Sequence, residues 1–505
     1  MSNDLHFVAS LRGSYHAVKA ALPWLDASRC DGDPPAFTAY ARPPTVPGVR
    51  RSMLCAPDDT AADLVVYDPD RNAGIDVITD NARRLIEART PLVLLHTDVD
   101  VTTVGEIAEA HPDLQIIIES GPRKLLYHYE ALRRTLAAHS NVYLSTYNLL
   151  NWMGLEELCA AGLGERLLYG SHAPRYSEDM AMGPIAMADI LWSQKCGIAG
   201  NNLRRLLGRA EAAPPEQPFT APSPFIIDAH AHCVRPGRTT VNPFPSPDQR
   251  FSPGDWLAFM DRCAVERMIL TPMETIFDAA QPAHELARDL CLAAPARFAY
   301  LEAFHPDGDA AHLQRLGASL QSASCAGIKI HPTVHRISGD DDRYAPAFCA
   351  AAESGKPVMT HSWEISEYNP DQQFSHPDRF RRWLREFPDV CLVLGHAGGR
   401  PSSFDSVVSL CREFPQLRVD LAGDYCDNGL VEALVAELGT ERVLFGSDVD
   451  WFDPRAHIAL VLGSQLTDDE ALSVLRGNAA KTYLSPLQQY STGVPLPPGP
   501  ERGSQ

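Results

Sequence analysis

Short apolar segments that end in polar residues recur twice along this chain with the same spacing, and this constrains its fold more than any other feature. In the second half, the runs PVMTH, CLVLGH and RVLFGSD end at His361, His396 and Asp448. In the first half, the runs PLVLLH, QIIIES and RLLYGSH end at His96, Ser120 and His172. The last two positions of both sets are 52 residues apart, since 448 − 396 and 172 − 120 are equal. We interpret this pattern as an internal duplication.

A proline-rich segment separates the two copies. The chain has 505 residues, enough for two or three domains, and its sequence GRAEAAPPEQPFTAPSP at 208–224 holds five prolines without apolar periodicity. The end of the chain is rich in Pro, Gly and Ser, which favours an irregular tail. We therefore divide the chain into a first half at 1–208, a linker at 209–224, a second half at 225–484 and a flexible tail at 485–505.

The composition argues against several classes of function. The formal net charge of −20 disfavours binding to nucleic acids and to anionic membrane surfaces. The twelve cysteines form no CxxC pair, and the N-terminus lacks the basic and apolar regions of a signal peptide. No apolar run reaches the roughly 18 residues that a membrane-spanning helix needs. We expect a cytoplasmic protein that acts on a small molecule.

The second half alternates apolar runs with amphipathic stretches, as a parallel sheet covered by helices does. About eight such units in about 260 residues match the size of a closed (β/α)8 barrel. Strands are predicted near Phe225, Met268, Phe298, Gly327, Pro357, Val390, Leu417 and Arg442. Polar residues follow strands one, four, five, six and eight, on the face where active sites of such barrels lie. The predicted fold class is α/β, with a C-terminal TIM barrel preceded by an incomplete, degenerate TIM-barrel-like domain.

The sequence IDAHAHC at the start of the second half indicates a metal site. His230 and His232 occupy alternate positions of one strand, so both imidazoles face the same side and can reach one cation. An isolated pair of this kind can equally line a packed barrel mouth. His361, His396 and Asp448 favour the metal, because four imidazoles and a carboxylate are costly to gather in one cavity without a cation.

Taken in order, several segments of the second half resemble the amidohydrolase superfamily: DAHAH, GIKIHP, the strand-ending His361, LGHAGG, FGSD and RGNAAKTYL. The resemblance is to the amidohydrolase-related branch that includes aminocarboxymuconate semialdehyde decarboxylase. It covers 225–484 well and 61–208 as a degenerate copy.

The resemblance implies a set of metal ligands and two proton-handling residues. The implied ligands of a divalent metal, most simply one zinc ion, are His230, His232, His361 and Asp448. His396 then orients the attacking water or binds a second metal. A bound cation makes its water more acidic and polarises the substrate carbonyl, and Asp448 carries the proton to the leaving group.

Lys329 in GIKIHP has two interpretations. In some members of the superfamily, a lysine at this strand end is carbamylated and bridges two metals, which implies two zinc ions. Alternatively, Lys329 is an ordinary lysine that neutralises Asp448 or binds a substrate carboxylate. We favour the second interpretation, because single-metal sites are common in this branch.

Further residues are expected around the mouth of the pocket. The candidates for substrate binding follow the fourth, fifth, sixth and eighth strands and are His331, His335, Arg336, Trp363, Arg400 and Trp451. Aromatic and guanidinium groups there suit a planar substrate that carries a carboxylate or an amide. The polar insert SWEISEYNPDQQFSHP after His361 is long for a strand-to-helix connection and predicts a lid or specificity loop.

The first half lacks most of the matching ligands. Alignment of the copies sets Val66 against Lys329, Ser120 against His396 and His172 against Asp448, and leaves only His96 unchanged. Residues 1–60 also contain no HxH sequence. We expect a remodelled domain without a metal site, which packs against the catalytic barrel or mediates a homodimer. A residual metal site formed by His96 and His172 is the less favoured alternative.

Three functions remain open at this point. The main hypothesis is a metal-dependent hydrolase that cleaves a C–N or C–O bond in an amide, lactam or lactone through metal-activated water. The first alternative is a metal-dependent, non-oxidative decarboxylase of the same superfamily, because the retained ligands are compatible with both reactions. The second alternative is a ligand-binding pseudoenzyme, which the complete ligand set in the second half disfavours.

Overall fold

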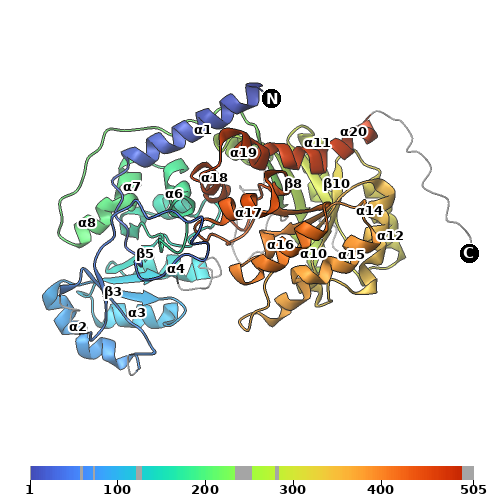
Figure 1. Ribbon diagram of the computed structural model, residues 1–505. Helices are drawn as coiled ribbons and strands as arrows, with labels where there is room; N and C mark the ends of the chain where they lie inside the picture. Colours follow the sequence, from blue (N-terminus) through green and yellow to red (C-terminus); the bar gives the residue numbers. More distant parts are fainter. Residues whose placement is uncertain are drawn as a thin grey trace, which may run out of the picture.

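A computed structural model of the protein describes residues 2–56, 61–71, 74–120, 128–233, 253–278 and 284–491. The described residues form two parallel sheets that follow each other along the chain, with six strands in the first half and eight in the second. Figure 1 shows the two halves side by side, the first in blue to green and the second in yellow-green to red. Within the described residues, no helix has both the length and the apolar character that crossing a membrane requires.

The six strands of the first sheet pair in chain order, and every pair is parallel. These strands are β1 (Arg51–Met53), β2 (Leu64–Val66), β3 (Leu92–Leu95), β4 (Ile116–Glu119), β5 (Val142–Ser145) and β6 (Leu167–Leu168). The helices of this half are α1 (Ser2–Ala21), α2 (Asp76–Ala88), α3 (Val101–Ala110), α4 (Tyr129–Ala138), α5 (Gly154–Ala160), α6 (Glu178–Met187), α7 (Trp192–Cys196) and α8 (Asn202–Leu206). Helix α2 is typical, because it buries one face through Ile78, Ala82 and Leu85.

The eight strands of the second sheet also pair in chain order and in parallel. They are β7 (Ile226–Cys233), β8 (Val265–Pro272), β9 (Phe298–Ala303), β10 (Cys325–Ile330), β11 (Val358–His361), β12 (Leu392–Gly395), β13 (Leu417–Asp420) and β14 (Val443–Leu444). All eight lie where the sequence predicts them.

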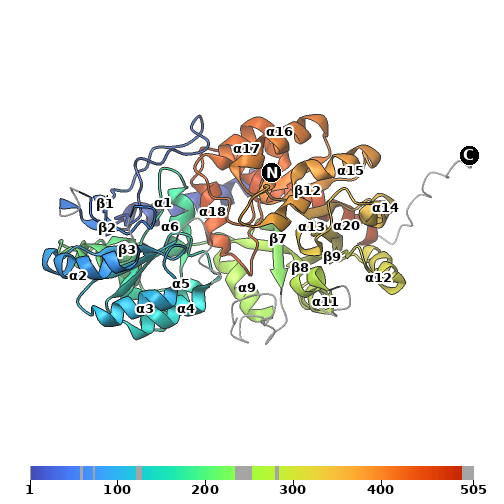
Figure 2. The same ribbon diagram turned by 90° about the horizontal axis from the view of Figure 1, so that it is seen from below.

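Helices follow the strands of the second half and surround them, as Figure 2 shows from below. They are α9 (Pro253–Arg262), α10 (Met273–Phe277), α11 (His284–Ala293), α12 (Ala310–Leu320), α13 (Pro332–His335), α14 (Ala345–Ser354), α15 (Arg381–Glu386), α16 (Phe404–Glu413), α17 (Leu430–Leu438), α18 (Pro454–Leu462), α19 (Asp468–Leu472) and α20 (Ser485–Ser491).

Backbone contacts bring the first and last strands of the second sheet together. The Ala229 N–H donates to the Phe445 carbonyl at 3.0 Å, and Ala231 forms a parallel bridge with Val449. One buried apolar cluster takes side chains from strands all around this sheet and therefore fills its inside. The predicted parallel barrel of the second half is confirmed.

The end of the chain differs from its prediction. The sequence predicts an irregular tail from Ser485, whereas the structure continues as helix α20. The helix persists because Leu487 is buried in the cluster that fills the barrel. The predicted tail beyond Ser491 lies outside the described residues. The predicted linker at 209–224 carries no helix or strand and is exposed or half-buried along its length.

The two halves share hydrogen bonds at matching positions. The Ala27 N–H donates to the Tyr169 carbonyl at 2.9 Å, as Ala229 does to Phe445. The hydroxyl of Ser171 donates to Asp26, as that of Ser447 does to Asp228. The side-chain amides of Asn202 and Asn478 each donate to two backbone carbonyls. The segment LDASRC at 25–30 therefore matches IDAHAH at 227–232, with Ser28 and Cys30 in the places of the two histidines.

Strand register corrects one step of the sequence alignment. Leu95 pairs with Glu119 in the first sheet, as His361 pairs with Gly395 in the second. Leu95 rather than His96 is thus the counterpart of His361, because the apolar run before His96 is one residue longer. The sequence alignment of Val66 with Lys329 agrees with the register, since these residues pair with Val93 and Met359.

Candidate metal centre

A cavity of about 210 Å³ lies at the carboxyl ends of the barrel strands. The predicted site residues that line it are His230, His232, Lys329, His331, His361, Trp363, His396, Asp448 and Trp451. The other lining residues are Met273, Phe277, Thr333, Val334 and Gln372. The cavity therefore combines nitrogen and carboxylate donors with aromatic and apolar walls.

His230, His232 and Asp448 converge at the floor of this cavity. The Asp448 Oδ1 lies 2.9 Å from His232 Nε2 and 3.7 Å from His230 Nε2. One potential ligand atom from each of the three lies within 4.8 Å of the other two. Asp448 adopts a left-handed backbone conformation, with φ at 63°, just after β14.

Three outer contacts aim histidine nitrogens into the cavity. His230 Nδ1 lies 3.0 Å from Asp420 Oδ2, while the Nδ1 atoms of His232 and His396 each lie 3.0 Å from a backbone carbonyl oxygen. These contacts select the tautomer in which Nε2 carries the free lone pair. Asp420 was missed in the sequence, although it ends strand β13 in the same way that the predicted polar residues end theirs.

A divalent cation fits this donor set. The two ring nitrogens of His232 both face oxygen atoms, one on Thr271 and one on Asp448. A neutral imidazole has only one N–H, so a cation held between Nε2 and the carboxylate satisfies both groups. Two imidazole nitrogens and one carboxylate oxygen suit zinc or manganese.

Lys329 lies against the same cluster from strand β10. Its Nζ is 2.8 Å from His230 Nε2, and its side chain is buried. Burial lowers the pKa of the Lys329 amine to about 8, although the nearby carboxylates of Asp420 and Asp448 oppose this shift. The amine can therefore hold or release a proton near neutral pH.

His361 lines the cavity but stands apart from the other three predicted ligands. Its Nε2 lies 2.9 Å from the Gln372 Oε1, and its ring stacks on His331 at 4.2 Å. Among the described residues, no group of mutually close ligand atoms includes it. The structure thus brings three of the four predicted ligands together, and it adds Gln372 from the predicted specificity loop to the wall.

Three predicted substrate-binding residues lie outside the lining of the cavity. The ring nitrogens of His335 face Tyr344 Oη at 2.8 Å and the Ile276 carbonyl at 3.0 Å. Arg336 directly follows helix α13 and points to solvent. Its side chain is 74% exposed and pairs with Asp371. Arg400 forms an ion pair with Asp424 at 2.9 Å and lies over the Trp363 ring. Arg400 thus packs against Trp363, which lines the cavity, without lining the cavity itself.

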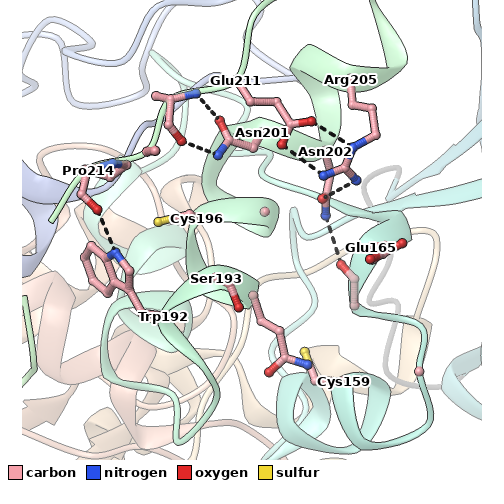
Figure 3. Close-up of a pocket in the computed structure, with 16 residues that line it drawn as sticks. Cys159, Glu165, Trp192, Ser193, Cys196, Asn201, Asn202, Arg205, Glu211 and Pro214 are labelled. Atoms are coloured by element: carbon pink, nitrogen blue, oxygen red, sulfur yellow. Dashed lines mark hydrogen bonds and ion pairs between the residues drawn. The ribbon is translucent and has the colours of Figure 1, made fainter. Parts of the chain in front are cut away.

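A larger cavity, of about 530 Å³, lies in the first half between α7, α8 and the start of the linker. Figure 3 shows that many of its polar groups are already bonded to one another. Arg205 pairs with Glu211 at 3.0 Å, and the amide of Asn202 donates to the Gly164 carbonyl at 2.9 Å. These contacts hold helices and linker together and leave no cluster with the chemistry of the barrel site.

The first half carries a salt-bridge cluster where the second half has its metal donors. Glu119 is buried and pairs with Arg51 at 3.0 Å and with His172 Nε2 at 2.8 Å. Burial alone raises the pKa of Glu119, but Arg51 and His172 outweigh it and lower the pKa to about 2. In the described part of this half, no three candidate ligand groups lie close enough to share a metal.

Comparisons with known proteins give one family match and several similar structures. A model of the family described as Amidohydrolase matches residues 227–484. The chain is similar to 5-carboxyvanillate decarboxylase LigW from Sphingomonas paucimobilis, with 17% identity and a TM-score of 0.40 over 52% of this chain and 99% of that one. It is also similar to 2,6-dihydroxybenzoate decarboxylase from Rhizobium, with 15% identity and a TM-score of 0.41 over 51% of this chain and 98% of that one.

A third similar structure is 5-carboxyvanillate decarboxylase from Novosphingobium aromaticivorans complexed with manganese, with 12% identity and a TM-score of 0.39. It aligns over 51% of this chain and 95% of that one. No curated protein sequence gives a significant match. The family match covers just over half of the chain and contains the barrel with its clustered histidines and aspartate. The chain belongs to the amidohydrolase superfamily.

Proposed function

We propose that the barrel is a metal-dependent, non-oxidative decarboxylase of a small planar carboxylate. One observation carries this proposal: the buried Lys329 amine, with a pKa of about 8, lies 2.8 Å from His230 Nε2. Burial raises the pKa of Asp448, but the contact with His232 and the other nearby imidazoles outweigh it and hold that pKa well below its usual range. The site therefore offers a proton donor and a weak base, which suits decarboxylation better than hydrolysis.

His230, His232 and Asp448 would hold one divalent cation, with zinc or manganese as the candidates and with His361 and His396 nearby. When bound, the cation supplies a positive charge that binds oxygen atoms of the substrate and stabilises the negative charge that develops during the reaction.

The side chains around the cluster supply the remaining parts of the reaction. Trp363 and Trp451 line the cavity with flat apolar faces that suit an unsaturated ring and keep water out. The bond between the ring carbon and its carboxyl group breaks, carbon dioxide leaves, and the electron pair stays on the carbon. Lys329 donates a proton to that carbon and regains one from solvent.

Hydrolysis of an amide, lactam or lactone is the second candidate. Asp448 favours it, because a carboxylate beside a metal can accept a proton from the attacking water. Its low pKa makes it a weak acceptor, so we rank this reaction below decarboxylation.

A product assay separates these functions. Enzyme loaded with zinc or manganese is incubated with aromatic and unsaturated carboxylic acids, and with lactones and amides, in D2O and in H2(18)O. We expect release of carbon dioxide and one deuterium at the carbon that lost the carboxyl group. Uptake of 18O without carbon dioxide means hydrolysis instead. Binding of a test compound without either product indicates a ligand-binding protein.

Replacing Lys329 by Met is expected to lower turnover by about 100-fold, because the proton donor is lost while the buried volume is kept. The matched control is Lys356→Met. Lys356 is also buried, its pKa is also lowered to about 8 by burial, and its amine donates to the Leu320 and Ser322 carbonyls away from the cavity. The control should lose stability and keep its turnover per folded molecule. Equal losses of turnover in both variants contradict the assigned role of Lys329.

A further inference from the structure

Two loops at matching positions in each half form contacts between the halves. Each loop meets the counterpart of the other loop rather than its own. The loop after β5 meets the loop after β14. There Asn151 forms an antiparallel β-bridge with Phe452, and the Asp453 N–H donates to the Leu150 carbonyl at 2.7 Å. In return, the loop after β6 meets the loop after β13. There Tyr176 forms an antiparallel β-bridge with Asp427, and the Ser177 N–H donates to the Cys426 carbonyl at 2.9 Å.

The helices that follow β6 and β14 pack directly on each other. A Cβ atom at Gly183 of α6 would lie 2.5 Å from the Ala459 Cβ and 2.3 Å from the Arg455 carbonyl oxygen of α18. Only glycine permits this approach. Gly183 and Ala459 are counterparts, since both lie eleven positions after the matching residues His172 and Asp448. A residue that touches its own counterpart marks a two-fold axis, and exchanged loops are the pattern of a symmetric dimer interface.

The first half thereby reaches the loop that carries part of the metal centre. Residues 448–453 include Asp448 of the cluster and Trp451 of the cavity wall. Arg455 donates to Asp453 at the end of this loop at 2.8 Å and to Glu156 of the first half at 2.9 Å. The Arg455 side chain is 3% exposed, so this link is shielded from solvent.

We propose that the first half acts as a permanently attached partner subunit, and that Glu156 is a positioning residue which holds the 448–453 loop, and so Asp448, at the metal centre. Without Glu156, the Arg455 guanidinium keeps only Asp453 as a carboxylate partner, and the loop loses its charged link to α5. This inference rests on the proposed metal site, and it goes beyond it by giving the non-catalytic half a part in metal binding.

The test compares Glu156→Gln with Glu119→Gln in the full chain. Both variants remove the charge of a first-half carboxylate that pairs with an arginine. Glu119 pairs with Arg51 of its own half, whereas Glu156 pairs with Arg455 of the second half. We measure the affinity for manganese or zinc by competition with a chromogenic chelator, hydrogen exchange of residues 448–455, and kcat and KM separately. For Glu156→Gln we expect an affinity about tenfold weaker and faster exchange in the loop, with a fall in kcat. Glu119→Gln should change neither affinity nor loop exchange.

Equal effects of the two substitutions, or unchanged affinity and exchange in Glu156→Gln, would overturn the proposal. Should Glu156→Gln fail to fold, Glu156→Asp replaces it. That variant keeps the charge on a shorter side chain, and an affinity equal to wild type with unchanged exchange would then count against the proposal. If the wild-type protein binds neither metal, the proposed function fails, whereas loop exchange still decides whether Glu156 positions the loop.

Discussion

Replacing Asp448 by Asn is expected to lower turnover by about 1,000-fold or more, while the protein still unfolds cooperatively. The amide keeps the shape of the side chain but loses the negative charge that faces His232 Nε2 at 2.9 Å and that completes the cluster of ligand atoms. Loss of a metal ligand and of a proton-handling group each removes a large share of the rate. Steady-state kinetics and the metal content per chain, by elemental mass spectrometry, check this outcome.

His96→Ala is the control for this substitution. His96 follows β3 in the first half and does not line the barrel cavity, so its replacement should leave turnover close to that of the wild type. A folded but inactive His96→Ala variant would mean that the chemistry takes place in the first half and not in the barrel. About one metal per wild-type chain is consistent with Lys329 as an amine, whereas about two point to a carbamylated Lys329 that bridges them.

Replacing Arg455 by Met is expected to lower the free energy of unfolding by about 3–5 kcal/mol, because it leaves the buried Asp453 and the half-buried Glu156 beside an apolar side chain. Burial favours the neutral form of Glu156, but Arg455 outweighs it and lowers the pKa of Glu156 to about 2. The stabilisation is therefore complete above pH 4.5 and is lost as the pH falls towards 2.

Urea denaturation followed by circular dichroism at pH 7 measures this loss. Arg343→Met is the control, since Arg343 makes its ion pairs with Asp341 and Asp307 at the exposed surface and should contribute little. A loss for Arg455→Met as small as that of the control would mean that the link between the halves adds no stability.

The barrel and most of its cavity lining could be predicted because they depend on local patterns. Apolar runs that end in polar residues predict the strands and the face on which Asp448, His396 and Lys329 lie, since parallel strands of a barrel end on one face. The same patterns missed the first-half segment at 25–30, because LDASRC keeps the aspartate of IDAHAH but none of its histidines. Only the repeated hydrogen bonds from Ala27 and Ser171 reveal the match.

The sequence by itself determined the parallel barrel, the superfamily and the pair of histidines on one strand, because the alternation of apolar and polar residues is written into neighbouring positions. Only the tertiary structure decided which atoms meet. In the folded chain His361 contacts Gln372, the Arg336 side chain is exposed to solvent, and Arg455 donates to Glu156, which lies 299 positions away in the sequence. These outcomes depend on how loops and whole halves pack, and residues so far apart leave no periodic signal in the sequence.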